Sequence, residues 1–221
     1  MQINNSVLKH YLKNVMFING TAYAGKSTMV KMLADKYGLV HCGENYDCVP
    51  KHLINPKTHP NLCYFQTMKN WQEFVNRPPQ EYFDWIVGVS KECAEFEIIH
   101  LISVSQTQKT IVDTNMPLDV LFEIADYNQV AIMLSPQSMS VERFFDRNDS
   151  DKVFIKEQIM KADNPEKTMQ NFRDCVAKIN SKEIYEEFAN SGFFTLVRED
   201  TNIDTKEETL TILAKHFRLV G

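Results

Sequence analysis

Glycine is scarce in this chain, and several features that would assign it to a class at once are missing. Only 7 of its 221 residues are glycine. No apolar run approaches the roughly 18 uncharged residues that a membrane-spanning helix needs, and residues 1–14 lack the apolar centre of a signal peptide. An excess of basic residues is also missing, because the formal net charge is −5. We therefore expect a cytoplasmic protein without a membrane partner or a general nucleic-acid-binding surface.

Paired cysteine motifs are missing too. The 5 cysteines are odd in number and show no Cys-x-x-Cys spacing, which favours thiols in a reducing compartment. His52 and His59 flank a proline-containing loop, but no matching cysteine or carboxylate set accompanies them, so we interpret them as surface residues. With 43% hydrophobic residues, a chain of this length predicts one domain over residues 1–221 with a substantial core.

Two of the few glycines stand in one short segment. Residues 20–27 read Gly-Thr-Ala-Tyr-Ala-Gly-Lys-Ser, which is the pattern GxxxxGK[ST] of a phosphate-binding loop, or P-loop. The apolar run at residues 14–18 predicts a buried strand before it. Apolar residues at helical spacing over 28–37, followed by Gly38, predict a helix after it with a glycine C-cap.

The chemistry of such a loop explains its residue types. Glycines allow successive backbone N–H groups to turn toward a polyphosphate, and the N-terminus of the following helix adds its positive dipole. We expect Lys26 to reach the terminal phosphates of a nucleoside triphosphate and the Ser27 hydroxyl to ligate Mg²⁺. The expected nucleotide-binding residues here are Gly20, Thr21, Ala22, Tyr23, Ala24, Gly25, Lys26, Ser27 and Thr28. A glycine-containing turn without a ligand is the alternative.

Short apolar runs alternate with amphipathic stretches along the rest of the chain, which is typical of a parallel sheet covered by helices. Strands are predicted at residues 14–18, 39–42, 110–113, 130–134 and 193–197, and further helices at 81–105 and 206–217. The buried candidates of helix 81–105 include Cys93, Ile99 and Ile102. Two segments interrupt this pattern: we expect 45–105 to be a substrate-side helical insertion and 137–190 to be a helical lid. The predicted fold is α/β, a three-layer αβα arrangement of the P-loop NTPase type.

Polar residues follow the predicted strands at their carboxyl ends, where open parallel sheets bind ligands. Asp113 ends the strand at 110–113, so it could hold Mg²⁺ through water, accept a proton from an attacking hydroxyl, or merely cap a turn. Asp47 competes for the role of base or substrate-orienting residue, although its position in a loop slightly favours an ordinary surface turn. We therefore treat Asp113 as a metal and catalytic candidate and Asp47 as a substrate-binding one.

Two arginines in the predicted lid are spaced for one helix face. Arg143 and Arg147 are four residues apart, and guanidinium groups suit phosphoryl oxygens, so the pair could neutralise a transferring phosphoryl group. Pairing with neighbouring carboxylates on a solvated face is the alternative, and we interpret Lys152 as solvated charge. Seven aromatic residues favour a core over a ring-stacking pocket: Tyr64, Phe65, Trp71, Phe74, Tyr82, Phe83 and Trp85.

Together these features resemble the P-loop small-molecule kinases, the superfamily of nucleoside monophosphate kinases and shikimate kinases. The similar pieces are residues 16–28, 111–113, 197–201 and the pair Arg143 and Arg147. The resemblance implies a five-stranded parallel sheet, ATP with Mg²⁺, a lid that carries arginines, and an acceptor region between the second and third strands. It also implies that Arg198, Asp200 and Thr201 lie near the adenine.

The chain departs from these kinases at the positions that define their acceptors. Its third strand continues as Asp-Thr-Asn-Met-Pro over residues 113–117, without the Asp-Gly and downstream Pro-Arg pattern of nucleoside monophosphate kinases. The Gly-Gly-Gly run of shikimate kinases and an Asp-x-Asp after the second strand are also absent. We expect an ATP-dependent kinase of a small hydroxylated or phosphorylated acceptor. An antibiotic or nucleotide-sugar phosphotransferase, and a nucleotide-binding regulatory NTPase without an acceptor, remain alternatives.

Overall fold

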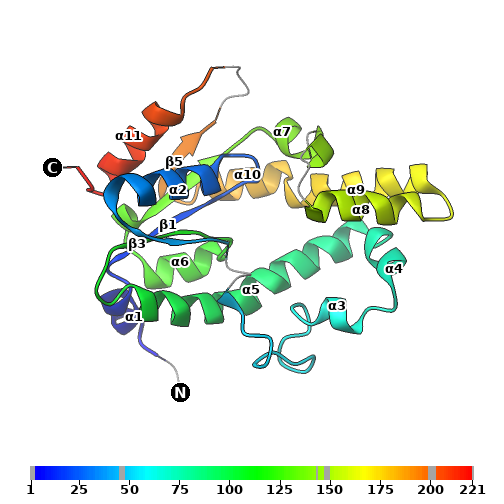
Figure 1. Ribbon diagram of the computed structural model, residues 1–221, viewed down its shortest axis with the longest axis horizontal. Helices are drawn as coiled ribbons and strands as arrows, with labels where there is room; N and C mark the ends of the chain where they lie inside the picture. The colour runs from blue at the N-terminus through cyan, green and yellow to red at the C-terminus, as the bar shows by residue number, and fades with distance from the viewer. Residues whose placement is uncertain (1–2, 45–47, 143, 147–149, 199–202, 221) are drawn as a thin grey trace.

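The centre of the protein is an open, all-parallel sheet of five strands in the order β2-β3-β1-β4-β5 (Figure 1). The computed structural model describes residues 3–44, 48–142, 144–146, 150–198 and 203–220. The strands are β1 (Val15–Gly20), β2 (Val40–Cys42), β3 (Thr110–Asp113), β4 (Val130–Leu134) and β5 (Phe194–Val197). All five predicted strands are therefore confirmed, with ends that differ by no more than two residues.

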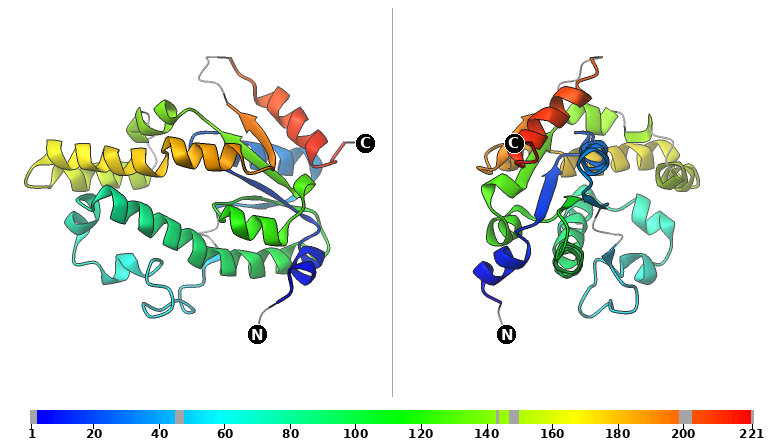
Figure 2. Two further views of the ribbon diagram at one scale, coloured as in Figure 1. Left: turned by 180° about the vertical axis from the view of Figure 1, so that it is seen from behind. Right: turned by 60° about the vertical axis from the view of Figure 1, so that its left-hand side comes forward.

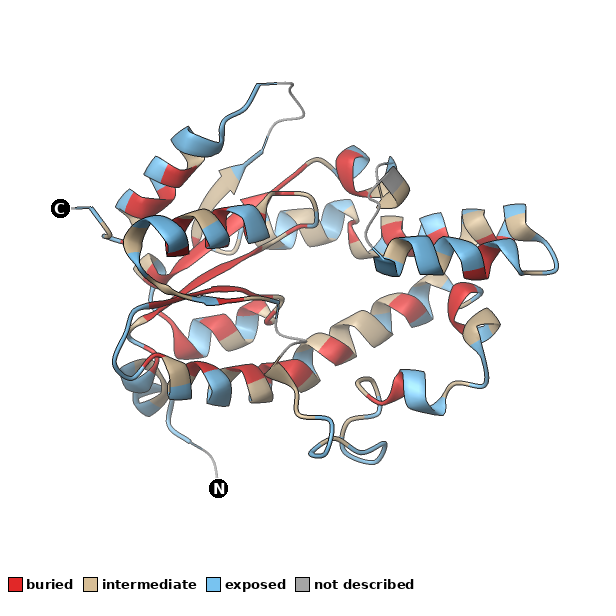
Figure 3. Cartoon of the chain, in the orientation of Figure 1, coloured by how far each residue is buried: buried red, intermediate tan, exposed pale blue. Residues whose placement is uncertain are grey.

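Helices cover both faces of this sheet, which makes three layers. On one face lie α2 (Lys26–Tyr37) and α11 (Lys206–His216), and on the other α1 (Asn5–Tyr11), α5 (Pro79–Val104), α6 (Leu118–Ile124) and α10 (Lys182–Ala189). Side chains of β1 alternate between two cores, since Phe17 packs on the α5 and α6 side and Ile18 on the α2 and α11 side. Both are fully buried, as a parallel sheet covered on both faces requires. Figure 3 shows the buried residues concentrated along the inner strands β1, β3 and β4.

The helices predicted at 28–37, 81–105 and 206–217 are confirmed as α2, α5 and α11. Helix α2 is capped by Gly38, which adopts the left-handed conformation at φ 65° that the glycine C-cap predicts.

The prediction that Ile99 of α5 is buried is wrong, because its side chain is 69% exposed. The buried stripe of α5 instead includes Cys93, Glu97 and Leu101. Residues four apart share one helix face, so a carboxylate occupies a position where an apolar side chain is expected.

A second group of helices extends from the carboxyl edge of the sheet and has a core of its own. We call it the helical body; it comprises α3 (Tyr64–Thr67), α4 (Trp71–Val75), the N-terminal half of α5, α7 (Gln137–Glu142), η3 (Phe144–Asp146), α8 (Ser150–Met160) and α9 (Pro165–Ile179). Figure 2 shows α5 running from beneath the sheet into this body, beside the α8 and α9 pair. Parts of the two insertions expected at 45–105 and 137–190 thus pack against each other, whereas α10, within the expected lid, covers the sheet instead.

Aromatic side chains make up most of the core of the helical body. Tyr64, Phe74 and Tyr82 are buried, and Phe74 lies 6.1 Å from Phe172 between ring centroids. Trp85 packs at the edge of the same cluster, where its indole N–H donates to the Asn61 carbonyl. The interpretation of these aromatics as core is confirmed for Tyr64, Phe74 and Tyr82, but it is wrong for Phe65, whose side chain is 45% exposed.

The cysteines remain thiols, and burial is the main cause of their largest pKa shifts. Burial raises the pKa of Cys93 to about 12 and that of Cys175 to about 11, so both stay protonated at neutral pH. No disulfide joins any of the cysteines.

Within the described ranges, no cluster of three potential metal-ligating His, Cys, Asp or Glu side chains forms. Nor does any described helix have the length and apolarity needed to cross a bilayer.

Gly20 occupies a position that only glycine fits. It ends β1 beside Met133 of β4 at φ 127°, and a Cβ there would collide with the Met133 backbone oxygen. We expect Gly20→Ala to lower the free energy of unfolding by about 3–5 kcal/mol, because left-handed strain and overpacking add. The matched control is Gly38→Ala, where no atom lies near the added methyl group, so only about 1–2 kcal/mol is lost. Urea unfolding measures both variants, and equal losses would refute the collision at Met133.

Candidate functional site

The carboxyl ends of the strands converge at a point where the direction of the chain switches. Strand β1 leads to β2 on one side of itself, whereas β3 leads across β1 to β4 on the other side. Open α/β sheets bind their ligands in the crevice at such a switch point. The segment 20–27 leaves β1 there and enters α2, so the sequence motif lies where the topology favours a ligand.

The carbonyl groups of this loop are held by side chains from three different elements. Tyr23 and Gly25 both adopt positive φ, at 65° and 90°. The three bonds are Lys26 Nζ to the Thr21 carbonyl at 3.3 Å, Ser135 Oγ to the Ala22 carbonyl at 2.5 Å, and Arg198 Nη1 to the Tyr23 carbonyl at 2.9 Å. The donors come from α2, the end of β4 and the end of β5. The backbone conformation of the loop is therefore fixed from several sides.

The N–H groups of the same loop are left available. In the described part of the chain, no acceptor takes the backbone N–H of Ala22, Ala24, Gly25 or Lys26. These donors stand at the N-terminus of α2, where the helix dipole is positive, and the Lys26 ammonium is largely buried beside them. Such a concave row of donors suits an anion, and polyphosphate above all.

A carboxylate and a hydroxyl meet next to this row of donors. Ser27 Oγ donates a hydrogen bond of 2.5 Å to Asp113 Oδ2. Asp113 is only 1% exposed, and its Oδ1 atom is buried without a protein partner in the described structure. Buried acceptors normally have a hydrogen-bond partner or a cation, so an oxygen without one in the described residues is suited to a ligand. Oxygen ligands of this kind fit Mg²⁺, which takes one or two protein oxygens and keeps several waters.

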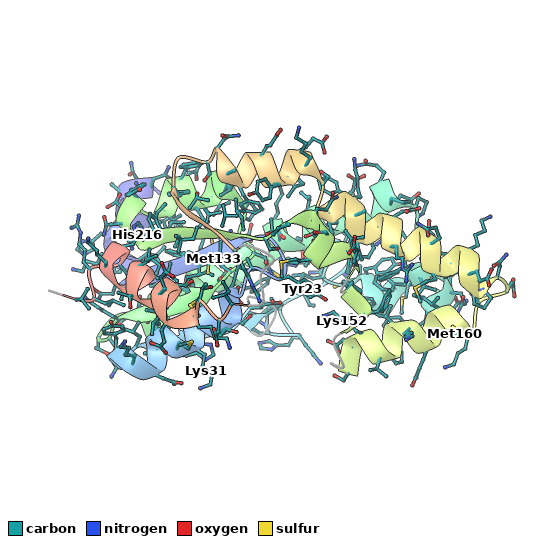
Figure 4. The ribbon with its side chains drawn as sticks, turned by 90° about the horizontal axis from the view of Figure 1, so that it is seen from above. Tyr23, Lys31, Met133, Lys152, Met160 and His216 are labelled. Carbon is teal, nitrogen blue, oxygen red and sulfur yellow. The ribbon has the colours of Figure 1, made fainter. Side chains whose placement is uncertain are left out.

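Helix α8 brings a cation from the helical body to the same loop. Lys152 Nζ lies 5.8 Å from the centroid of the Tyr23 ring and 5.2 Å from that of Phe144. Figure 4 shows Tyr23 and Lys152 near each other, between the sheet with Met133 and the far end of α8 at Met160. Our interpretation of Lys152 as simple solvated charge therefore needs correction, because the side chain lies over two aromatic rings.

The structure describes Thr28 and Arg198 among the other predicted site residues. Thr28 lies in the first turn of α2 with an exposed side chain. Arg198 contacts the backbone of the loop, which gives it a place at the site although its expected proximity to adenine stays a prediction. The remaining predicted residues lie outside the described ranges: Asp47, Arg143, Arg147, Asp200 and Thr201.

Sequence reasoning assigned no role to several polar side chains that shape the site. Ser135 follows β4 directly and bonds to the loop, so the strand-end rule that selected Asp113 would have found it. Asn19 precedes the motif, and its Oδ1 accepts the Gly20 N–H at 2.6 Å. Glu97 lies on α5 and accepts a hydrogen bond from Thr114. In the sequence, the only indication of its burial is that this charged residue stands at a position where helical spacing predicts a buried side chain.

The fold and the site define an α/β protein with an open parallel sheet and a donor-lined loop at its switch point. No protein-family model matches this chain, and no curated protein is significantly similar to it in sequence. A functional assignment therefore depends on the side chains and the geometry described above.

Proposed function

We propose that the protein is an ATP-dependent phosphotransferase that acts on a small-molecule acceptor. The observation that carries the proposal is the 20–27 loop, whose carbonyls are bound by Lys26, Ser135 and Arg198 while its N–H groups are left for an anion. A triphosphate matches that row of donors in charge and in length. The adjoining Ser27 and Asp113 oxygens then give the donor nucleotide a place for its cation.

The chain's own groups supply positioning and electrostatics, which provide most of the catalysis in phosphoryl transfer. The loop N–H groups and the Lys26 ammonium hold the β- and γ-phosphates. Mg²⁺, when bound by Ser27 and Asp113, neutralises charge on the phosphate oxygens. An acceptor oxygen forms the new bond to the γ-phosphorus as the bond to the bridging oxygen of ADP breaks. The acceptor proton passes to a carboxylate, for which Asp113 and Asp47 are the candidates.

The position of the helical body supports an acceptor on that side of the loop. Lys152 of α8 reaches the Tyr23 ring, so the body lies beside the place proposed for the terminal phosphates. We propose that Arg143 and Arg147, which flank η3, neutralise charge on the transferring phosphoryl group. The helical body would then provide both the acceptor pocket and the lid.

Nucleotide binding and acceptor-dependent turnover test this function separately. Calorimetry of the full chain with MgATP and MgADP is expected to show one site per chain. ADP release is then measured without an acceptor and with panels of nucleosides, nucleotides, sugars and aminoglycosides. Stimulation by one acceptor class of about tenfold or more over the basal rate supports a kinase. Failure to bind either nucleotide would refute the proposal, and release that no acceptor changes would favour a regulatory NTPase.

A further inference from the structure

A second carboxylate, Glu97, is buried where the sheet meets the helical body. It belongs to α5, the helix that packs in the sheet core at one end and in the helical body at the other, and it is 1% exposed. Burial of a carboxylate costs free energy unless hydrogen bonds compensate it. Cys42 at the end of β2 lies close enough to be affected: burial, and in second place the charge of Glu97, raises the pKa of its thiol.

A hydrogen bond that Glu97 accepts helps to fix the turn that follows β3. The Thr114 hydroxyl donates to Glu97 Oε2 at 3.0 Å, and the same hydroxyl oxygen accepts the Met116 N–H at 2.9 Å. Thr114 is completely buried, so water does not replace either bond. Glu97 thereby fixes both the rotamer of Thr114 and the backbone of the next two residues.

The network continues from this turn to the first residue of the loop. The Met116 carbonyl accepts a bond of 2.7 Å from Asn19 Nδ2, and Asn19 Oδ1 accepts the Gly20 N–H at 2.6 Å. Asn19 and Met116 are each 1% exposed. A series of hydrogen bonds, buried except for the last at Gly20, thus connects the middle of α5 to the loop.

The end of β3 is consequently held from both faces of the sheet. Asp113 and Thr114 are consecutive, and consecutive side chains of an extended strand point to opposite faces. Ser27 of α2 binds Asp113 on one face, while Glu97 of α5 binds Thr114 on the other. A shift of Thr114 toward or away from α5 therefore moves Asp113 relative to Ser27.

We propose that Glu97 is a positioning residue, which acts through Thr114 to set the place of Asp113 and so the Mg²⁺ requirement of nucleotide binding. The inference rests on the proposed function, since it concerns the cation of the same site. It assigns a role at the cation site to Glu97, which lies on the face of the sheet opposite α2 and is not one of the residues proposed to touch the nucleotide.

The test is a Mg²⁺ titration of ADP binding by the full chain at a fixed ADP concentration. Thr114→Val removes the hydroxyl that links Glu97 to the turn, and we expect it to raise the half-saturating Mg²⁺ concentration about tenfold, as outer-shell losses do. Glu97→Ala is expected to have a similar effect. The double variant is expected to resemble the stronger single variant, because both changes break one link. Thr114→Ser keeps the hydroxyl and is expected to stay within about twofold of the original chain.

Gln129→Leu is the matched control for a general loss of stability. Gln129 is also largely buried, and its Nε2 donates two bonds of 2.8 Å to the Leu12 and Val15 carbonyls at the amino edge of the sheet. We expect it to lower the melting temperature without changing the Mg²⁺ requirement. If Thr114→Val does not fold, Glu97→Gln replaces it, with an expected rise of about threefold because a neutral acceptor bonds less strongly.

The outcomes separate this inference from the proposed function. If the original chain binds no ADP at any Mg²⁺ concentration, the proposed function is refuted and the role of Glu97 with it. If the original chain binds ADP with Mg²⁺, but the folded Thr114 and Glu97 variants keep its Mg²⁺ requirement, the positioning role is refuted and the proposed function stands.

Discussion

Replacement of Lys26 by alanine is expected to lower ATP turnover by about 10²–10³-fold, while the protein stays folded. The Lys26 ammonium lies at the start of α2, and among the described residues it bonds only to the Thr21 carbonyl, at 3.3 Å. In the proposed mechanism it neutralises charge on the β- and γ-phosphates, and no other described side chain of the loop carries a positive charge. The alanine variant leaves the N–H groups in place, so residual nucleotide binding is expected with severely reduced turnover.

The effect of this change on stability is expected to be small or favourable. The Lys26 side chain is 9% exposed, and an ammonium at that depth is incompletely compensated by one carbonyl. Its removal relieves desolvation of the charge, so the melting temperature is expected to stay equal or rise. A fall in both turnover and melting temperature would point to misfolding rather than to lost phosphate contacts.

Lys31→Ala serves as the matched control on the same helix. Lys31 pairs with Asp35 at 2.7 Å, and its side chain is 68% exposed on the outer face of α2. Exposed pairs of this spacing contribute about 0.3–0.5 kcal/mol, so turnover is expected to be unchanged. A coupled assay of ADP release measures both variants. Undiminished turnover in Lys26→Ala would refute the phosphate-binding role of the loop.

Phe172→Ala is expected to cause a loss of stability as large as that of Gly20→Ala, although it lies in the helical body rather than in the loop at residues 20–27. The Phe172 ring is 1% exposed and contacts Phe74, Tyr82, Phe144 and Phe145 across the helical body. Truncation of a buried phenylalanine costs about 3–5 kcal/mol. For a chain of this size that corresponds to a fall in melting temperature of about 6–20 °C. Circular dichroism during heating measures it.

Phe154→Ala is the control from the same cluster, because Phe154 is 37% exposed and contacts Trp71 at the edge of the body. We expect a loss below about 1.5 kcal/mol for it. At temperatures where both variants remain folded, MgADP binding is expected to persist, since the loop is held by Ser135 and Arg198 from the sheet. If Phe154→Ala lost as much stability as Phe172→Ala, the difference in burial between the two positions would not explain their contributions to stability.

The sheet could be predicted from the sequence because each strand is a short apolar run with clear ends. Strands at 110–113 and 130–134 match β3 and β4 residue for residue, since both are buried on both faces and no polar residue interrupts them. The helical body could not be predicted as one unit. Its core depends on contacts between Phe74 and Phe172, which are far apart in the chain, and local periodicity contains no information about that pairing.

The candidate site, too, could be predicted only where neighbouring residues of the sequence carry the signal. Ser27 and Asp113 were both selected from the sequence, because a motif and a strand end identify them locally, and the structure places them in direct contact. Glu97 was missed because a carboxylate within a helix is ordinarily interpreted as an exposed residue. Its burial follows from the position of Thr114 beyond the end of β3, which only the assembled sheet defines.

The bond between Arg198 and the Tyr23 carbonyl has a consequence for biosynthesis. The loop is translated before Ser135 and Arg198, which fix its carbonyls and emerge from the ribosome more than 100 residues later. Strand β1 also lies between β3 and β4 and cannot be paired on both edges until β4 has been made. A nascent chain halted before β5 would therefore contain the whole glycine and lysine motif without a finished anion site. The competence of residues 20–27 is acquired only after Arg198 at the end of β5 has been synthesised.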